Sequence, residues 1–159
     1  MSELQDLWEK IKDVRVAMLT TTEHDGSLRS RPMYTQQAEF DGDLWFFTAD
    51  DSGKVAEIRA DSDVNLAYAE PKDSRYVSVS GKAELVKDRT KIDELWSPAL
   101  KAWFKGGKDD PHIALLRVRV SEAEYWDDTQ SKMSQLFGMI KAVTGSGTYE
   151  STEHGVVKP

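Results

Sequence analysis

The feature that most restricts the fold of this chain is a series of segments in which apolar residues stand at every second position. Val64, Leu66 and Tyr68 form one such segment, and residues 77–85 form a longer one. Because successive side chains of a strand point to opposite faces, this period of two predicts strands with one buried face. The chain is therefore predicted to be built mainly from β-strands.

Runs of β-branched and aromatic residues predict more strands of the same kind. With the two segments above, they give six or seven strands in all, over 15–22, 28–38, 44–48, 64–68, 77–85, 113–120 and 123–126. Asp25-Gly26 and Asp41-Gly42 separate the first three strands, and such pairs favour hairpin turns. Because no helix intervenes there, an antiparallel barrel is expected rather than a doubly wound sheet.

Four helices are expected around this barrel, because apolar residues recur there at helical spacing. They lie over residues 3–13, 52–60, 88–104 and 131–144. Ser2 and Gln5 form a capping-box pattern at the first helix, and Pro98 interrupts the third.

The C-terminal segment differs from the rest of the chain. Residues 145–159 are rich in glycine, serine and threonine and have no apolar periodicity. Such a segment cannot bury enough surface to offset its ordering entropy, so we expect a flexible tail. The prediction is one domain over 1–144, whose stability does not change when the residues after Gly147 are removed.

The composition excludes several classes of function. The chain has 159 residues and a formal net charge of −7. An acidic surface repels phosphate backbones and anionic lipids, so nucleic-acid and membrane binding are not expected. The chain has no cysteine, which excludes disulfides, thiolate catalysis and zinc–thiolate sites. The first residues show no signal-peptide pattern, so we expect a cytoplasmic protein.

Few of the common catalytic patterns occur. Gly106-Gly107-Lys108 lacks the first glycine of a P-loop and predicts a surface turn. His24, His112 and His154 are scattered without ligand spacing, so no metal site is expected. No side chain stands out as a general acid or base, and none is assigned as catalytic.

One anion site is predicted where the third strand meets the second helix. Ser52 and Lys54 stand at this junction, and the free N–H groups of a helix start favour an anion. Arg31 on the second strand could add a forked contact to a phosphate. The alternative is that Ser52 only caps the helix, Lys54 is solvated and the arginines of the second strand, Arg29 and Arg31, face water.

Several motifs follow one another in an order that resembles a known family. They are Arg31-Pro32-Met33, 45–48, Ser52-Gly53-Lys54, 63–68, 76–83 and Glu124-Tyr125-Trp126. Over about residues 14–126, this order resembles the pyridoxamine 5′-phosphate oxidase-like FMN-binding split β-barrel superfamily. The Arg-Pro-Met motif and the tryptophan-containing segment 95–98 resemble its general stress protein branch. The resemblance implies a mainly β fold with peripheral helices (α+β), an antiparallel six- to seven-stranded split β-barrel.

The resemblance also implies a cofactor and a homodimer with flavin sites at the subunit interface. FMN is the expected cofactor, and FAD, a deazaflavin or haem are the alternatives. By position, the phosphate would be held by Arg31, Ser52 and Lys54. The flavin ring would be bordered by Thr48 and by the backbone of Pro32 and Met33. Two residues would reach the ring from the other subunit, Tyr76 and Trp126.

Two departures from the family argue against oxidation of pyridoxamine 5′-phosphate. Gly53 stands where the vitamin-forming oxidases carry arginine, and Asp127-Asp128-Thr129 replaces their arginine- and histidine-bearing C-terminal motif. We expect an FMN-binding general stress protein, a small flavin-dependent oxidoreductase of unknown substrate. The alternatives are a non-catalytic flavin carrier or redox sensor, or a barrel without cofactor. Trp96, Trp103 and Phe104 are expected in the core or at the dimer interface.

Overall fold

One antiparallel sheet makes up most of the molecule. The structure, a computed structural model, describes residues 2–127 and 153–159. Within these residues seven strands are joined in the order β2-β1-β4-β5-β6-β3, and β7 also pairs with β6. The strands are β1 (Val16–Thr22), β2 (Leu28–Tyr34), β3 (Asp43–Ala49), β4 (Asp63–Glu70), β5 (Arg75–Val86), β6 (Ile113–Asp127) and β7 (Glu153–Val157). The helices are α1 (Glu3–Ile11), α2 (Gly53–Ala60) and α3 (Arg89–Leu95), with 3₁₀ turns η1 (Pro71–Asp73), η2 (Pro98–Ala102) and η3 (Gly107–Asp109).

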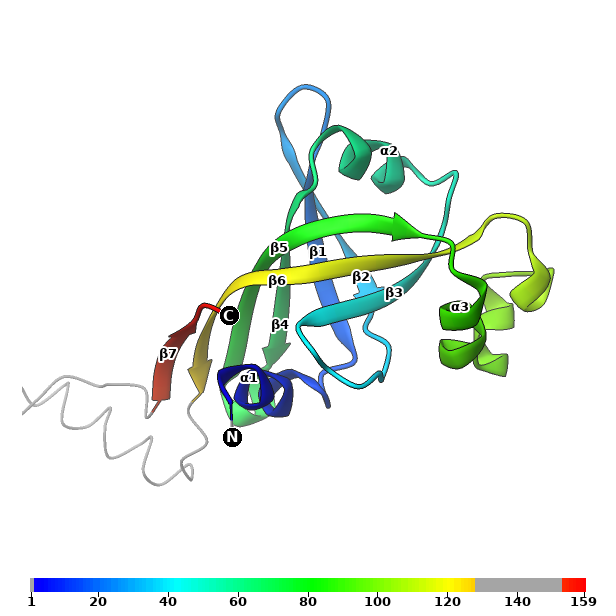
Figure 1. The fold of residues 1–159 in the computed structure, drawn as a ribbon. Coiled ribbons are helices and arrows are strands. Elements are labelled where there is room, and N and C mark those ends of the chain that lie inside the picture. The colour runs from blue at the N-terminus through cyan, green and yellow to red at the C-terminus, as the bar shows by residue number, and fades with distance from the viewer. Residues whose placement is uncertain (1, 128–152) are drawn as a thin grey trace, which may run out of the picture.

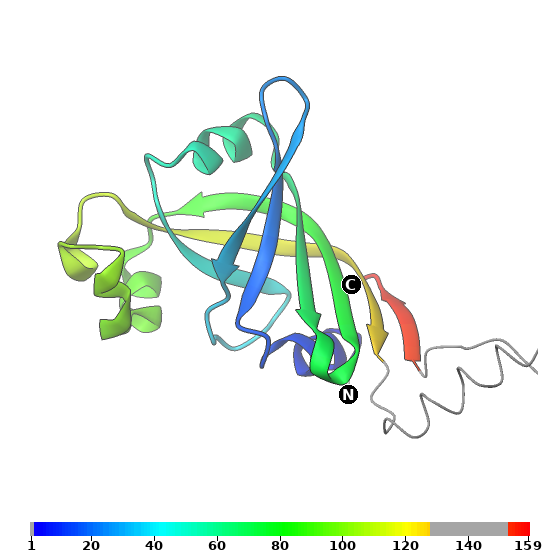
Figure 2. The same ribbon diagram turned by 180° about the vertical axis from the view of Figure 1, so that it is seen from behind.

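The long strand β6 organises this sheet. β5 pairs along one of its edges, whereas β3 pairs with residues 113–119 and β7 with residues 123–127. β3 and β7 therefore follow each other along the other edge of β6. The sheet coils into an open half-barrel, with α1 at one end and α2 beside the far end of the β1–β2 hairpin (Figures 1 and 2).

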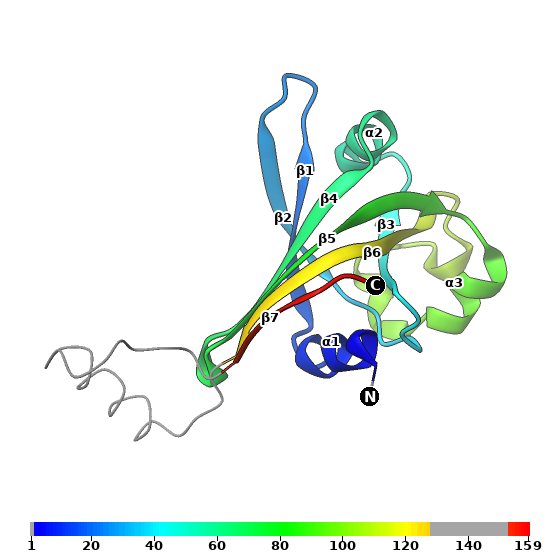
Figure 3. The ribbon, with the colours of Figure 1, turned by 60° about the vertical axis from the view of Figure 1, so that its left-hand side comes forward.

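The structure corrects the predicted pair of strands over 113–120 and 123–126, which are one strand with a β-bulge. Gly81 of β5 pairs with Val120, whereas the residue before Gly81 pairs with Glu122, so Ser121 is an extra residue in β6. A Cβ atom at position 81 would collide with the carbonyl oxygen of Arg119, so glycine is required for this close approach. β5 and β6 curve together along their length (Figure 3).

Of the two predicted hairpins, only the first is confirmed. β1 and β2 pair across the turn at Gly26, which has a φ of 86°. β2 ends at Tyr34 rather than at residue 38, and β3 pairs with β6 and not with β2. The backbone N–H of Thr35 still donates to the carbonyl of Arg15, the residue before β1. The next N–H, that of Gln36, donates to the carbonyl of Trp45 in β3. The chain thus passes from one side of the barrel to the other before β3 begins.

The main core fills the inside of the half-barrel. Fully buried side chains from the neighbouring strands β1, β4 and β5 include Leu19, Leu66 and Val79, and α1 adds Leu7 and Ile11. The capping box predicted at the start of α1 is confirmed by two reciprocal hydrogen bonds of 3.1 and 3.2 Å. No helix among the residues that the structure describes is long and apolar enough to cross a membrane.

A second, smaller cluster joins α3 and η2 to the outer part of β3 and β6. The predicted helix over 88–104 is instead α3 followed by η2, because Pro98 interrupts the helical ladder. Phe104 is buried in this cluster and Trp96 packs against it, as expected, but Trp103 is 69% exposed. The glycine-lysine segment after it forms the turn η3, as predicted.

The C-terminal residues correct the prediction of a flexible tail. Glu153–Val157 form β7 and pair with β6 in antiparallel register. Val157 is only 4% exposed and belongs to the main core. Because successive side chains of a strand point to opposite faces, a short strand can bury a side chain without any helical periodicity in its sequence. The predicted helix over 131–144 and the segment 145–152 lie outside the described residues.

A prediction follows from the way β7 packs. A Cβ atom on Gly155 would lie 2.5 Å from the Tyr125 hydroxyl oxygen, so Gly155→Ala forces the ring or β7 to move. We expect a loss of about 1–3 kcal/mol in the free energy of unfolding, measured by urea denaturation. Gly53→Ala is the control, because a Cβ atom there meets nothing within 4 Å. Equal stability of the two variants would contradict the tight packing of β7.

Candidate functional site

Lys54 lies where β3, the turn after it and α2 meet. Its ammonium donates hydrogen bonds to Thr48 Oγ1 at 3.0 Å and to Ser52 Oγ at 3.2 Å. Within residues 2–127 and 153–159, no carboxylate forms an ion pair with this partly buried amine. Burial lowers the pKa of Lys54, Arg31 adds to this by repulsion, and Glu57 opposes it. An anion would complete this set of donors.

The elements around Lys54 explain its position. β3 is held against β6, which buries Thr48 to 3% exposure. Ser52 is the N-cap residue of α2, but its side chain makes no capping hydrogen bond. Its hydroxyl instead accepts the hydrogen bond from Lys54. The interpretation that Ser52 only caps the helix and that Lys54 is solvated is therefore wrong.

Arg31 is held by an acidic partner on α2. Its Nη2 lies 3.1 Å from Glu57 Oε2, and its Nη1 donates to Thr21 Oγ1 at 2.6 Å and to the Leu19 carbonyl at 3.3 Å. Thr21 Oγ1 in turn donates to Glu57 at 2.5 Å, which closes the cluster. The Thr21 hydroxyl and then Arg31 lower the pKa of Glu57. Arg31 therefore faces this cluster and not open water.

The neighbouring residues Pro32 and Met33 point to opposite sides of β2. Met33 is 9% exposed and packs in the main core, whereas Pro32 is exposed and pairs with Met18. β2 is the last strand at its edge of the sheet within the described residues. The Thr35 N–H bonds to the Arg15 carbonyl, so the alternation along β2 turns the backbone groups of Met33 toward β1 and leaves the Pro32 carbonyl at the open edge.

Tyr76 and Trp126 lie far from Lys54 in the same chain. They are directly opposite each other on β5 and β6, and they are 45% and 37% exposed. Thr48 pairs with Ala114, twelve residues before Trp126. At about 3.3 Å per residue, this separates them by roughly 40 Å along the strand. One chain therefore brings Arg31, Thr48, Ser52 and Lys54 together, but not Tyr76 and Trp126.

β7 adds a side chain beside Trp126. The His154 ring stacks on the Trp126 ring, with 5.4 Å between centroids and 15° between planes. His154 Nε2 lies 2.8 Å from Glu124 Oε1. This pair orients the indole on the sheet surface, an arrangement that the expectation of a flexible tail did not include.

The outer face of the sheet is apolar at one end. The register places Met18 between Pro32 and Ala67, and Tyr76 between Ala69 and Trp126. We call the exposed apolar side chains of this face the outer patch. It consists of Val16, Met18, Pro32, Tyr34, Tyr76, Trp126 and Val156. The other end of the same face carries Thr20, Asn65, Ser80 and Glu122 and is polar.

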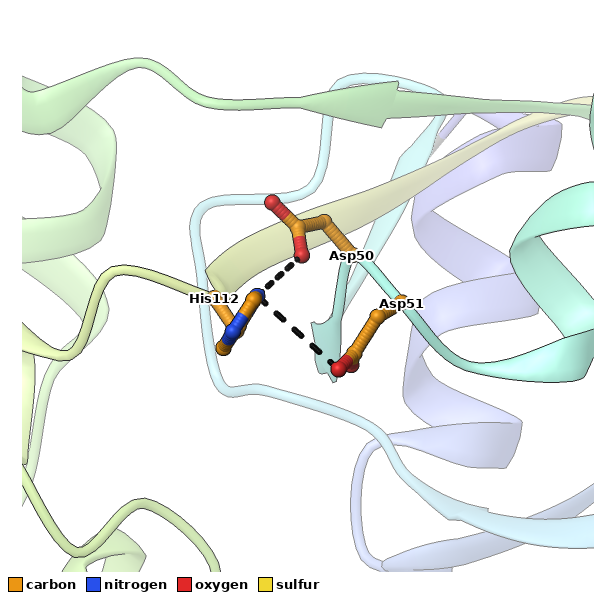
Figure 4. A group of neighbouring side chains, drawn as sticks. All are labelled: Asp50, Asp51 and His112. Carbon is orange, nitrogen blue, oxygen red and sulfur yellow. Dashed lines mark hydrogen bonds and ion pairs between the residues drawn. The ribbon is translucent and has the colours of Figure 1, made fainter.

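Another polar cluster lies beside the Ser52 turn. His112 Nδ1 lies 2.9 Å from Asp50 Oδ1 and 3.9 Å from Asp51 Oδ2 (Figure 4). Lys87 Nζ lies 2.5 Å from Asp50 Oδ2. The bonds to Lys87 and then His112 lower the pKa of Asp50, and the bond to Asp50 and the charge of Asp51 raise the pKa of His112. The three residues are spaced like metal ligands, but the ammonium of Lys87 already neutralises Asp50. This cluster ties the turn before Ser52 to β5 and β6.

Sequence reasoning did not identify Thr21, Glu57 and the Asp50–His112 pair as neighbours of the site. The sequence does contain a signal for Glu57, because this residue stands three positions after Lys54 and so lies on the same face of the helix. Thr21 and His112 had none, because they reach the site through strand pairing and a turn far apart in sequence.

Comparison with known proteins gives a consistent family. Residues 2–150 match the family model described as pyridoxamine 5′-phosphate oxidase like. The curated protein bli-3 of Neurospora crassa is 30% identical over an alignment of 151 residues, and the match covers 89% of this chain and 72% of bli-3.

Solved structures agree with this assignment. A structure described as general stress protein 26 from Jannaschia sp. CCS1 is 27% identical, with a TM-score of 0.78, and the match covers 98% of this chain and 97% of that one. The general stress FMN/FAD binding protein of Xanthomonas citri is 32% identical, with a TM-score of 0.70, and the match covers 80% of this chain and 90% of that one. The chain therefore has a split β-barrel fold and belongs to the pyridoxamine 5′-phosphate oxidase-like family, in its general stress protein branch.

Proposed function

We propose that this chain binds FMN in a homodimer and works as a small flavin-dependent oxidoreductase of the general stress protein branch. The observation that supports the proposal most is Lys54, a partly buried ammonium that donates hydrogen bonds to two neutral hydroxyl groups. The Xanthomonas citri relative is named as an FMN/FAD binding protein. The donor set here suits the phosphate that FMN carries and riboflavin lacks.

The roles of the residues follow from their chemistry. Lys54, Ser52 and Arg31 would hold the phosphate, and Thr48 with the backbone of β2 at Pro32 and Met33 would border the flavin ring. When bound, the flavin supplies the hydride and electron transfer, while the protein positions it and tunes its potential. Among these residues none is placed as a general acid or base, so substrate choice would depend on the shape around the ring. The expected cytoplasmic location stays a prediction.

The proposed dimer follows from two features of the fold. Tyr76 and Trp126 lie too far from Lys54 to share a flavin with it in one chain, but a second copy could bring them there. The outer patch offers an apolar surface that such a copy would cover, and its polar end would remain at the rim.

The carrier or sensor function is the other candidate, and turnover separates it from an enzyme. Purified protein with bound FMN should oxidise NAD(P)H in the presence of an added acceptor, whereas a carrier would not. The absorption spectrum tests the cofactor first. Oxidised flavin gives two visible bands, and haem gives a single intense band. A colourless protein that does not bind added FMN would refute the flavin proposal.

Lys54→Met tests the phosphate site. Loss of a charge-assisted contact of about 1.5–3 kcal/mol should weaken FMN roughly tenfold to a hundredfold and leave riboflavin nearly unchanged. Flavin fluorescence quenching measures both affinities. Lys105→Met is the matched control, because this lysine is exposed in the turn before η3 and makes no contact with Lys54. Equal losses for FMN and riboflavin would show general damage and not a phosphate site.

Met18→Glu tests the dimer. A charge buried in the outer patch of both subunits should raise the dimer dissociation constant at least about tenfold, because a buried methionine contributes roughly 1.5–3 kcal/mol. FMN affinity should fall with it. Ser80→Glu places the same charge at the polar end of the same face and should have little effect. Analytical ultracentrifugation gives the result, and a monomeric wild-type protein with full FMN affinity would exclude the shared site.

A further inference from the structure

The carboxylate of Glu57 occupies a position where it can compete with a ligand for Arg31. Glu57 Oε2 lies 3.1 Å from Arg31 Nη2 and accepts a hydrogen bond of 2.5 Å from Thr21. Both side chains of the ion pair are largely buried, with 17% of Arg31 and 11% of Glu57 exposed. At this burial the pair is screened less than a surface ion pair. The positive charge of Arg31 is therefore largely neutralised within the protein.

The same carboxylate also acts on Lys54. Lys54 and Glu57 are three residues apart on α2, so they project from one face of the helix. Burial lowers the pKa of Lys54 most, the charge of Arg31 lowers it further and the charge of Glu57 raises it, so both charges act on the amine. Arg31 and Lys54 thus share one anion, Glu57, whose pKa the charge of Arg29 also lowers to a smaller extent. Of Arg31 and Lys54, it is Lys54 that forms no ion pair with a described carboxylate.

We propose that Glu57 is a built-in competitor of the cofactor phosphate, which neutralises Arg31 and limits the affinity of the site for the phosphate. This inference rests on the proposed FMN site. Glu57 is a positioning residue in this role, because it acts on the phosphate through Arg31 and through its own charge. Its consequence is a cofactor that exchanges with the solution instead of remaining permanently bound.

Glu57→Gln is the direct test, because the amide keeps the shape and can still accept hydrogen bonds from Thr21 and Arg31. Removal of the negative charge of Glu57 removes its repulsion of the phosphate and should raise the affinity for FMN about three- to tenfold. Riboflavin affinity should stay the same, and FMN dissociation should slow by a similar factor. Glu57→Met is a second neutral variant with the same expected direction.

A double variant separates charge from structure. Arg31→Met alone leaves Glu57 without its counter-charge and should weaken FMN. In the Arg31→Met, Glu57→Gln double variant the pair is neutral again, so FMN affinity should return close to the wild-type value. Glu23→Gln is the matched control, since it makes the same charge change on the β1–β2 hairpin without contact to Arg31.

The outcomes distinguish this inference from the proposed function. If wild-type protein binds no FMN, or Lys54→Met has no effect on its binding, the proposed function fails and the inference fails with it. If Lys54 is required but Glu57→Gln and Glu57→Met weaken FMN, or change FMN and riboflavin equally, Glu57 only supports the structure. The inference would then be overturned while the phosphate site remains.

Discussion

The fold depends on the backbone hydrogen bonding of β6 along both of its edges. β5 uses one edge, and β3 and β7 divide the other between them. The half that pairs with β3 sets the position of Thr48 and of the turn that leads into α2. The half that pairs with β7 sets the orientation of Trp126. The β-bulge opposite Gly81 lies between the two halves and allows the strand to serve both ends of the barrel.

Charge is distributed unequally over the two cations near α2. Arg31 is satisfied by Glu57, Thr21 and a backbone carbonyl, whereas Lys54 meets only hydroxyl groups. Such a difference matters because desolvation is costly for a partly buried cation that forms no ion pair. The stabilising pair fixes α2 on the hairpin, and the less satisfied amine remains for a ligand. The ion pair thus holds α2 against the hairpin and offsets one positive charge of the site, whereas the charge of Lys54 is not offset by an ion pair.

Much of the fold could be predicted from local pattern. Alternation located β4 and β5, the Asp25-Gly26 pair located the first hairpin, and Ser2 with Gln5 located the start of α1. The prediction of a second hairpin was wrong because turn residues indicate where a chain reverses but not which strand it pairs with next. β7 was missed because a five-residue strand gains its stability from a long partner and not from its own composition.

The candidate site was predictable only in part. Ser52 and Lys54 are close in sequence and follow from the strand-to-helix junction. The partner of Arg31 was not predictable from β2 alone, because Glu57 comes from another element and meets it through tertiary packing. The predicted cofactor-binding residues include Tyr76 and Trp126, which one chain leaves at the opposite end of the sheet.

The open edge of β2 has a consequence for how copies of this chain can associate. Pro32 offers no N–H group to a further strand, and Arg29 adds a charge on the same strand. Extension of the sheet from this edge is therefore disfavoured, although extension is the route by which strands polymerise without limit. Contact through the sheet face instead can close on itself around a two-fold axis. The same short strand thus favours an assembly of defined size over a growing one.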